Sequence, residues 1–396
     1  SPTMTQTLPM PDENALAASR ALVARICEEA RREGDFLTFE RFMELALYAP
    51  GLGYYAGGSR KFGAGGDFVT APEVSPLFSR CLAVQVAEVL ARLGGGVVLE
   101  FGAGSGVMAA DVLIELAARN ALPEKWLILE VSGELRERQA SLLSETTPQH
   151  ASRVQWLDRL PEEPFDGVIV ANEVLDAFPV QRFRIGPEGI ETGRVCCEGE
   201  VPAGCWGRSP PEVVEAVDVI RQEVALDDEY CSEVCLRLTP WVDAAGEVLG
   251  RGAMLLIDYG YPRAEYYHPD RSDGTLLCHY RHRAHSDALF LPGLQDITAH
   301  VDFTAVGLAA LASGLEVAGF VTQAQFLLNC GLEGFLAKAR AAGAVEGVKA
   351  AQQAKRLVLP TEMGERFKVM ALTRRVSDDD SAPLVGFSNG DLRYRL

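Results

Sequence analysis

The chain has 396 residues, 48% of them hydrophobic, so it can bury a large core in two or three domains or in one elaborated domain. Its net charge of -18 argues against a general affinity for nucleic acids, because binding to phosphates requires a basic face. No apolar run reaches the ~18 residues of a membrane-spanning helix, and no apolar segment follows a basic start as in a signal peptide. We therefore expect a protein that neither inserts into a membrane nor binds nucleic acid.

Helical patterns and a long glycine-rich loop make up the first 96 residues. Apolar residues at helical spacing predict a helix over residues 15–33, and Thr38 is placed to cap a second helix. The loop APGLGYYAGGSRKFGAGGDFVTAPEVSP follows. A third helix, PLFSRCLAVQVAEVLARLGG, is expected to end at Gly94 to Gly96, because glycine commonly ends helices. We expect residues 1–96 to form a helical extension whose loop covers a cofactor.

From residue 97 onward, short apolar runs alternate with amphipathic helical patterns. The runs are VVLEF, WLILEV, RVQWL and FDGVIVAN, and helices are expected from about Val107 and about Gly133. This alternation predicts a parallel sheet with helices on both faces. Three later runs, GAMLLIDYG, LEVAGFVTQAQF and RFKVMALTRR, predict further strands. The expected segments are a cofactor-binding core at 97–184, a mixed insertion at 185–250, the rest of the sheet with substrate-side loops at 251–375, and a flexible tail at 376–396.

Three glycines at alternate positions follow the first of these strands, in LEFGAGSG. A strand, a glycine turn and a helix form the nucleotide-binding geometry of an open α/β sheet. The dinucleotide fingerprint G-x-G-x-x-G would need glycine at Val107. S-adenosylmethionine has no phosphate, and its amino-acid end and ribose must approach the backbone at Gly102, Gly104 and Gly106. Its amino group and hydroxyls also need acceptors such as Glu100. Tight packing of a strand on a helix is the alternative explanation of such glycines.

Polar residues also end the next strands. Glu130 can accept hydrogen bonds from ribose hydroxyls, although it could equally be a solvated strand-end carboxylate. Leu157 could pack on adenine and Asp158 could accept from its exocyclic amine, or Asp158 could simply start a turn. Asn172 and Glu173 emerge from the very apolar fourth strand, which packing alone explains poorly.

These motifs resemble the MidA-type family of class I S-adenosylmethionine-dependent methyltransferases. The resemblance covers roughly residues 38–375 and rests on ALYAPGLGYY, GDFVTAPEVSPLF, VLEFGAGSG, NEVLDAFPVQRF, LLIDYG and LPGLQDITAHVDFTA. It implies a Rossmann-like, mostly parallel seven-stranded sheet and S-adenosyl-L-methionine as cofactor. The mitochondrial members are complex I assembly factors that symmetrically dimethylate an arginine of a core subunit. The resemblance therefore implies a protein substrate, such as a NADH dehydrogenase subunit, in a mitochondrial matrix or a bacterial cytoplasm.

Arginine methylation would require carboxylates in the site. The guanidinium stays protonated, with a pKa above ~12, so carboxylates must hold the positive charge on the nitrogens that do not react. A bidentate pair also fixes the plane of the guanidinium. We expect Glu173 first, then Asp176 and Glu73, to have this catalytic role. The expected cofactor-binding residues are Asp67, Thr70, Pro72, Glu100, Gly102, Ala103, Gly104, Gly106, Glu130, Val131, Leu157, Asp158 and Asn172.

Other polar residues give weaker signals. Asp258 and Asp302 are expected to shape the substrate side. His279, His282 and His285 repeat every third residue, but arginines lie between them and zinc sites usually show tighter Cys/His pairs, so we expect no metal site. The nine cysteines show no C-x-x-C pair, and their odd number does not indicate a disulfide framework. We expect reduced thiols in a cytosol-like compartment.

Three functions are compatible with the sequence. They are a protein arginine methyltransferase, an assembly or chaperone protein that binds the cofactor with little activity, and a nicotinamide-dependent oxidoreductase. The incomplete dinucleotide fingerprint disfavours the oxidoreductase. The intact set Gly102, Gly104, Gly106, Glu130 and Glu173 favours catalysis over a degenerate binding protein. The sequence does not determine the oligomeric state.

Overall fold

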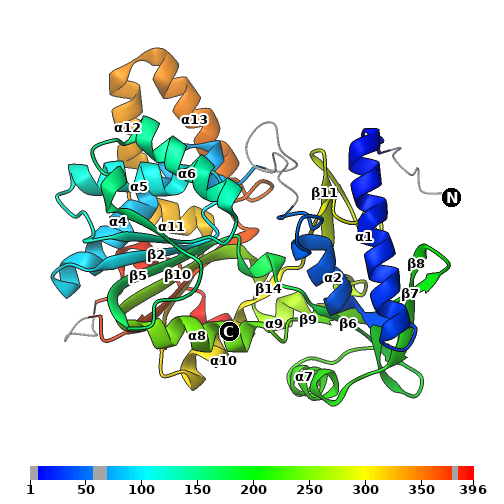
Figure 1. The fold of residues 1–396 in the computed structure, drawn as a ribbon. Helices are drawn as coiled ribbons and strands as arrows, with labels where there is room; N and C mark the ends of the chain where they lie inside the picture. The colour runs from blue at the N-terminus through cyan, green and yellow to red at the C-terminus, as the bar shows by residue number, and fades with distance from the viewer. Residues whose placement is uncertain (1–7, 57–68, 377–381) are drawn as a thin grey trace. The chain divides into compact units, whose positions relative to one another are not determined.

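The computed structural model describes residues 8–56, 69–376 and 382–396. The chain forms two compact units built from interleaved segments (Figure 1). The first unit combines described residues within 1–68 with residues 177–236 and 267–299, and the second consists of residues 69–176, 237–266 and the described residues from 300 onward. The units therefore do not follow the five consecutive segments expected from the sequence, and the expected insertion is divided between them after Leu236.

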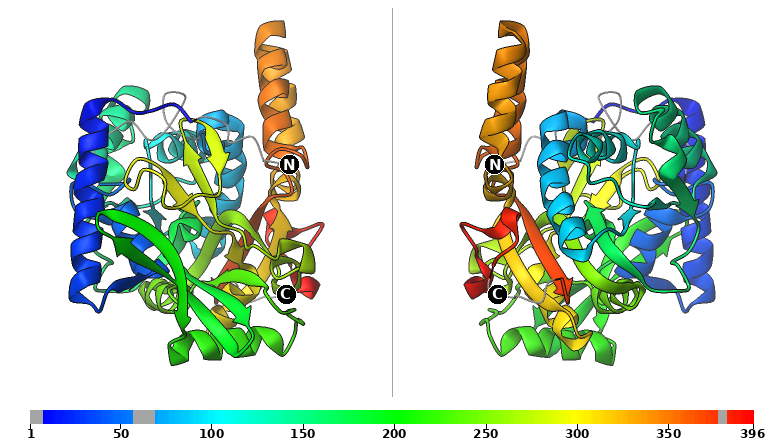
Figure 2. Two further views of the ribbon diagram at one scale, coloured as in Figure 1. Left: turned by 90° about the vertical axis from the view of Figure 1, so that its right-hand side faces the viewer. Right: turned by 90° about the vertical axis from the view of Figure 1, so that its left-hand side faces the viewer.

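The second unit contains the larger sheet. Its strands are β2 (Val97–Phe101), β3 (Trp126–Leu129), β4 (Val154–Leu157), β5 (Phe165–Asn172), β10 (Leu249–Tyr261), β14 (Val301–Asp302), β15 (Glu316–Thr322) and β16 (Phe367–Arg374). Its helices are α3 (Ala71–Val74), α4 (Pro76–Leu93), α5 (Val107–Ala118), α6 (Gly133–Thr146), α8 (Leu238–Val248), α9 (Arg263–Tyr266), α10 (Phe303–Ala312), α11 (Gln323–Asn329), α12 (Leu332–Ala342) and α13 (Ala344–Val358). Figure 2 shows that the α12–α13 pair extends away from this sheet.

The strand order of this sheet is β15-β16-β10-β5-β2-β3-β4, with β14 added beside β10. All neighbours from β10 to β4 are parallel, whereas β16 is antiparallel to both β10 and β15. The predicted mostly parallel seven-stranded sheet is confirmed, and helices α4, α5 and α6 lie on one face with α8 and α10 on the other (Figure 1). The chain moves outward from β2 in one direction and returns to β5 on its other side. Ligands of open α/β sheets bind at such a reversal, at the carboxyl ends of the strands.

Local signals set most of the element ends. Thr38 Oγ accepts a hydrogen bond from Arg41 N at 3.1 Å and caps its helix as predicted. Helix α4 ends at Gly94, whose φ of 79° lies in the left-handed region that glycine adopts readily. The predicted strand LEVAGFVTQAQF is correct only as far as Thr322. There the Oγ of Thr322 accepts from Gln325 N at 3.2 Å and starts helix α11 instead.

The predicted flexible tail is packed where the structure describes it. Leu384 and Phe387 are buried in the core of the second unit. Asn329 Nδ2 donates to the carbonyls of Gly386 and Asn389 at 2.8 and 2.9 Å. The polar composition of the tail predicts flexibility, but two buried apolar side chains and these hydrogen bonds hold its described part against the second unit.

The first unit contains a smaller antiparallel sheet and a three-stranded sheet. Its strands are β1 (Phe36–Thr38), β6 (Gln181–Gly186), β7 (Gly189–Glu198), β8 (Val201–Arg208), β9 (Cys231–Val234), β11 (Leu277–Tyr280), β12 (Arg283–His285) and β13 (Asp296–Thr298). Its helices are α1 (Glu13–Arg32), α2 (Phe39–Tyr48) and α7 (Pro211–Arg221). One apolar cluster joins residues of α1 and α2 to strand and loop residues of this unit.

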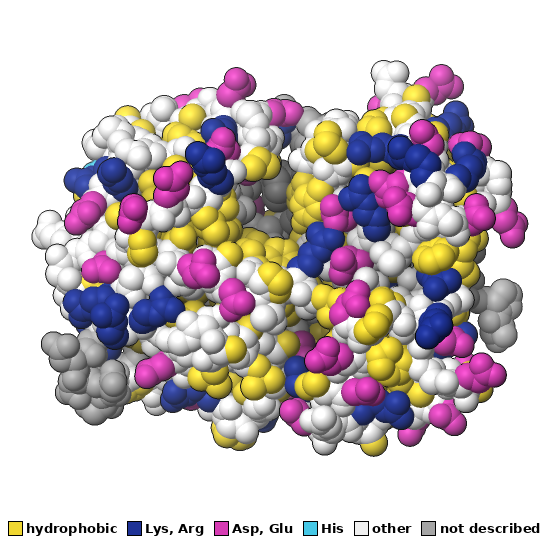
Figure 3. Space-filling model, turned by 60° about the horizontal axis from the view of Figure 1, so that its bottom comes forward, with side chains coloured by type: hydrophobic (Ala, Val, Ile, Leu, Met, Phe, Trp, Pro, Cys, Tyr) yellow, Lys and Arg dark blue, Asp and Glu magenta, His cyan; other side chains and the backbone are white. Residues whose placement is uncertain are grey.

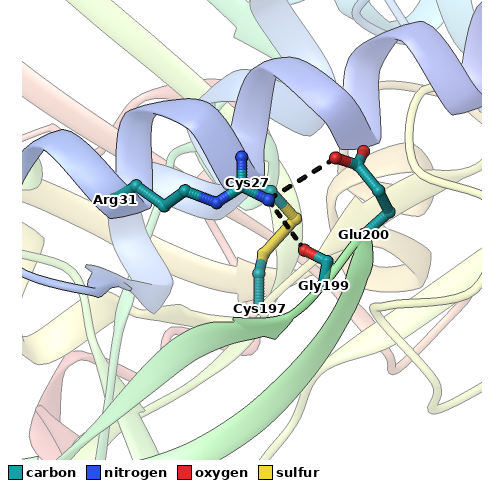
Figure 4. The surroundings of a disulfide bond; sticks show 5 residues. All are labelled: Cys27, Arg31, Cys197, Gly199 and Glu200. Atoms are coloured by element: carbon teal, nitrogen blue, oxygen red, sulfur yellow. Dashed lines mark hydrogen bonds and ion pairs between the residues drawn. A yellow bond between two sulfur atoms is a disulfide. The ribbon is translucent and has the colours of Figure 1, made fainter.

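The expectation of reduced cysteines is wrong for four of them. Disulfides join Cys27 to Cys197 and Cys196 to Cys205. Successive side chains of a strand point to opposite faces, so Cys197 reaches α1 on one face of the sheet, while Cys196 on the other face reaches Cys205 of the neighbouring strand β8. Arg31 of α1 also donates to Gly199 O at 2.9 Å beside the first disulfide (Figure 4). The pairing depends on contacts between distant segments, which spacing along the chain does not reveal.

Removing the Cys27–Cys197 disulfide is expected to destabilise the protein by about 2–5 kcal/mol, because the bond closes a loop with a sequence separation of 170 residues. The double variant Cys27→Ser/Cys197→Ser should unfold at a lower temperature than the wild type in calorimetry. Added dithiothreitol should bring the wild type close to the variant. The control is Cys81→Ser, which replaces a buried free thiol and keeps both disulfides, so dithiothreitol should lower its melting temperature by as much as it lowers that of the wild type. Nine free thiols in the untreated wild type would contradict the prediction.

No helix within the described parts of the chain is long and apolar enough to cross a membrane. On the face drawn in Figure 3, the described Lys and Arg side chains are interspersed with Asp and Glu side chains. That face therefore offers no continuous basic patch among the described residues, in keeping with the net charge of -18.

Candidate active site

The glycine turn after β2 has a backbone that other residues rarely adopt. The φ angles of Gly102, Gly104 and Gly106 are 60°, 56° and 92°, all in the left-handed region. A Cβ at Gly102 would lie 3.1 Å from Val174 Cγ2, and one at Gly106 would lie 3.2 Å from Gln139 Cα. Both conformation and space therefore require glycine here. Tight packing explains Gly106, while Gly102 is exposed at the edge where a ligand would lie.

Helix α3 meets this turn through a hydrogen bond from Ser105 Oγ to the carboxylate of Glu73. Thr70 occupies the N-cap position of α3 and Pro72 is buried in its first turn. Glu73, expected as a catalytic carboxylate, thus contacts the proposed cofactor turn, and its catalytic role stays a prediction. Asp67 lies outside the described residues.

Glu100 is buried at the end of β2, with 2% of its surface exposed. Its Oε1 accepts a hydrogen bond from Trp126 Nε1 at 3.1 Å. Burial raises the pKa of Glu100 to about 8, against the smaller opposing effect of the Trp126 bond, and the negative charge of Glu130 raises it further. Glu100 is therefore mostly neutral at pH 7, and its expected contact with the cofactor stays a prediction.

The raised pKa of Glu100 predicts how stability depends on pH. The folded state favours the neutral carboxyl, so stability falls as pH rises from the unfolded pKa of ~4.3 through the folded value of about 8. Glu100→Gln stays neutral and keeps an acceptor for Trp126. The free energy of unfolding of the variant minus that of the wild type should increase by ~1–3 kcal/mol from pH 5 to pH 8, as measured by urea unfolding without cofactor. A difference that is the same at both pH values would refute the assigned burial effect.

Glu130 follows β3 and is half-buried. Its Oε2 accepts from Ser132 N at 3.2 Å and its Oε1 from Gln139 Nε2 at 3.3 Å. The next residue, Val131, is 78% exposed. A fixed carboxylate beside an uncovered apolar side chain suits the ribose and the apolar face of a nucleoside.

The end of β4 lies directly beside this position. Glu130 N donates to Leu157 O at 3.0 Å, so the residues expected near ribose and near adenine are adjacent across the two strands. Leu157 is half-buried and Asp158 is exposed. Asp158 is thus accessible to a ligand, although an exposed carboxylate at a strand end needs no ligand to explain it.

The end of β5 has an unusual backbone. Glu173 has a φ of 55°, which is uncommon for a residue other than glycine, and its N donates to Ile257 O at 2.9 Å. Strained positions of this kind concentrate at functional sites. The Oδ1 of neighbouring Asn172 is buried and has no hydrogen-bond partner among the described residues. A polar ligand at this strand end would satisfy it.

Asp258, at the end of β10, holds the acidic turn formed by residues 173–176. Its Oδ2 accepts from Leu175 N at 3.0 Å and Asp176 N at 3.3 Å, and its Oδ1 accepts from Tyr259 N at 2.9 Å. Burial raises the pKa of Asp258 well above its usual value, and the negative charge of Glu173 raises it further. Asp258 is therefore a buried residue that supports the turn through its backbone, and its expected effect on the substrate side stays a prediction.

Asp302 is also a structural residue. Its Oδ1 caps α10 by accepting from Ala305 N at 3.1 Å, and its Oδ2 pairs with Arg263 Nε at 3.1 Å. The described residues contain no group of three or more His, Cys, Asp or Glu side chains that could hold a metal ion.

Four residues that were not predicted from the sequence complete the site. Ser105, Trp126, Trp156 and Gln139 all bond to predicted site residues or to one another. Ser105 lies inside the glycine motif and could have been named from it. The other three are reached only through packing between elements, so the sequence carries no local signal for them.

Comparisons with known proteins agree with this geometry. The family Methyltransf_28, described as S-adenosyl-L-methionine-dependent methyltransferases, matches residues 81–321. A crystal structure of a protein from Burkholderia thailandensis bound to S-adenosyl-homocysteine is 42% identical, covers 98% of this chain and 100% of that chain, and superimposes with a TM-score of 0.93. Protein arginine methyltransferase NDUFAF7, mitochondrial, is 26% identical in Danio rerio over 90% of each chain. The Mus musculus protein of that name is 29% identical over 85% of this chain and 80% of its own.

Proposed function

Because the chain belongs to the S-adenosyl-L-methionine-dependent methyltransferase family Methyltransf_28, we propose that it methylates arginine side chains of a protein substrate. The chain is an enzyme, and its cofactor is S-adenosyl-L-methionine. The observation that carries the arginine proposal is the acidic turn, in which Asp258 holds the segment bearing Glu173 and Asp176. The names of the Danio rerio and Mus musculus relatives support the same acceptor.

The residues at the strand ends fit the cofactor. The glycine turn leaves its backbone open at Gly102, and the buried Oδ1 of Asn172 lacks a partner among the described residues. We assign Glu130 to the ribose hydroxyls and Val131 to the nucleoside face. When bound, S-adenosyl-L-methionine supplies a methyl group activated by its sulfonium.

The acidic turn would prepare the acceptor. A guanidinium is cationic at any pH the protein tolerates, so its nitrogens are poor nucleophiles. The carboxylate of Glu173 would draw the positive charge to the nitrogens it contacts and fix the guanidinium plane. The reacting nitrogen then keeps more of its lone pair, and holding the two reactants in line can contribute ~7–11 kcal/mol. The nitrogen loses one proton on methylation, and Glu173 or Asp176 can accept it.

We extend the proposal to the substrate expected from the sequence resemblance, an arginine of a NADH dehydrogenase subunit in a mitochondrial matrix or a bacterial cytoplasm. The test is incubation of the purified enzyme with S-adenosyl-L-methionine and such a subunit, followed by peptide mass spectrometry. Two methyl groups on one arginine are expected, and an Arg→Lys substrate should stay unmodified. Methylation of lysine instead would overturn the arginine assignment. Binding of cofactor and subunit without any methyl transfer would favour the alternative of an assembly protein with little activity.

A further inference from the structure

Gln139 connects three strand ends of the cofactor-binding edge. It lies on α6, and its surface is 0% exposed. Its Nε2 donates to Gly104 O at 2.9 Å and to Glu130 Oε1 at 3.3 Å, and its Oε1 accepts from Trp156 Nε1 at 2.9 Å. We propose that Gln139 is a positioning residue that holds the glycine turn and the Glu130 carboxylate in the mutual arrangement that S-adenosyl-L-methionine requires. The inference rests on the cofactor-binding role proposed above for Glu130.

The bonding network fixes which way the amide faces. An indole N–H can only donate, so Trp156 requires the amide oxygen of Gln139. The amide nitrogen must then face the other side, where Gly104 O and the Glu130 carboxylate are both acceptors. Its two hydrogens match these two acceptors. No other uncharged side chain of this length supplies two donors and an acceptor in this arrangement.

Packing leaves the side chain little freedom to move. A Cβ at Gly106 would lie 3.2 Å from Gln139 Cα, so the backbone of α6 lies against the glycine turn. Ser132 ties Glu130 to the start of the same helix, because its N donates to Glu130 and its Oγ caps α6 by accepting from Leu135 N at 3.3 Å. A change of donor at Gln139 should therefore displace the Glu130 carboxylate and the Gly104 carbonyl rather than be absorbed by movement of the helix.

The variant Gln139→Glu tests this role because it keeps the size and the acceptor for Trp156 but removes both donors. Above the pKa of the new carboxyl, two carboxylates and a carbonyl oppose one another, and we expect the Kd for S-adenosyl-homocysteine to rise about tenfold or more at pH 8. At pH 5.5 a shared proton can restore one hydrogen bond, because two adjacent carboxylates raise each other's pKa, so affinity should return toward the wild type. Gln139→Met, which has no charge, should weaken binding equally at both pH values.

Gln85 offers a matched control in the same unit. It is also 0% exposed, its Nε2 donates to Glu88 Oε1 at 3.0 Å, and its Oε1 accepts from Gly386 N at 2.8 Å. Gln85→Glu should lower the melting temperature. At both pH 8 and pH 5.5, its Kd for S-adenosyl-homocysteine should equal that of the wild type. The same pattern in Gln139→Glu would reduce Gln139 to a packing residue and overturn the proposal.

Calorimetric titration with S-adenosyl-homocysteine needs no methyl acceptor, so a wrong arginine assignment leaves this test intact. Glu130→Ala identifies the other source of failure. If Glu130→Ala weakens binding and Gln139→Glu does not, only the positioning role is wrong. If neither variant weakens binding, the assignment of Glu130 to the cofactor is wrong as well, and the inference about Gln139 falls with it.

Discussion

Replacement of Gly104 by valine is expected to abolish measurable binding of S-adenosyl-L-methionine while the protein remains folded. Gly104 has a φ of 56°, and its carbonyl accepts the hydrogen bond from Gln139. The left-handed conformation costs a residue with a Cβ about 1–2 kcal/mol of conformational free energy, and it costs a β-branched residue more. Relaxing this strain would turn the carbonyl away from Gln139, while the new side chain would occupy the edge that the ligand needs. Affinity should fall by ~100-fold or more.

Gly94 is the matched control for this prediction. Its φ is 79°, and a Cβ there would meet no atom within 4 Å. It precedes β2, whereas Gly104 follows it, so the two glycines lie at opposite ends of one strand. Gly94→Val carries comparable backbone strain and should lower the melting temperature with little effect on the Kd. Equal affinity of Gly104→Val and the wild type in calorimetry would show that the turn only packs a strand on a helix.

The features that the sequence predicted are those set by residues close together in the chain. The run VVLEF followed by glycines predicted β2, its turn and α5, because alternating apolar strands and left-handed glycines are properties of short segments. The same holds for the cap at Thr38. The mostly parallel sheet with helices on both faces followed from the alternation of strands and helices together with the family resemblance, whereas the reversal between β2 and β5 is seen only in the structure.

Features that depend on distant contacts were missed. The disulfide between Cys27 and Cys197 requires α1 to lie on β7, and nothing near either cysteine indicates this. The division of the chain into two interleaved units has the same origin. Within the site, Gln139 lies in an ordinary helical segment, and it gains its three partners only because α6 lies against the glycine turn and the ends of β3 and β4. Long-range packing of this kind leaves no local pattern in one sequence.

Asp258 shows the difference between what a position in the sequence indicates and what the hydrogen-bond partners in the structure indicate. Its position at the end of the apolar run LLID marked it as a polar residue at the correct edge of the sheet. Its role follows only from the hydrogen bonds that it accepts from three backbone N–H groups, two of which belong to the acidic turn after β5. A carboxylate at a strand end can face a ligand or hold a neighbouring loop, and only the bonding partners distinguish these cases.

Replacement of Glu173 by glutamine is expected to remove catalysis and to leave cofactor binding nearly intact. The substitution keeps the size and shape of the side chain. We expect the backbone to keep its φ of 55° and its hydrogen bond to Ile257 O. If Glu173 holds the acceptor guanidinium, loss of its charge removes one preorganised electrostatic partner. Such a loss typically costs ~3–4 kcal/mol, so kcat should fall by about 10²–10³-fold.

The electrostatic surroundings supply a second readout. The negative charge of Glu173 helps to raise the pKa of Asp258, after the larger effect of burial. In Glu173→Gln the pKa of Asp258 should therefore fall toward its usual value. Folding stability should then fall less as pH rises, because a raised carboxyl pKa makes the folded state lose stability with increasing pH. The difference in urea stability between pH 5 and pH 8 measures this change without any substrate.

Three measurements on Glu173→Gln separate the possible roles: the Kd for S-adenosyl-homocysteine, the turnover on a protein substrate at saturating cofactor, and the mass of the target arginine peptide. Unchanged Kd with lost turnover places Glu173 on the acceptor, whereas a raised Kd with normal turnover places it on the cofactor. Glu134→Gln, which removes a carboxylate paired with Arg138 on the exposed side of α6, is the control and should change neither. If Glu173→Gln also changes neither, the acceptor role passes to Asp176, whose backbone Asp258 holds in the same turn.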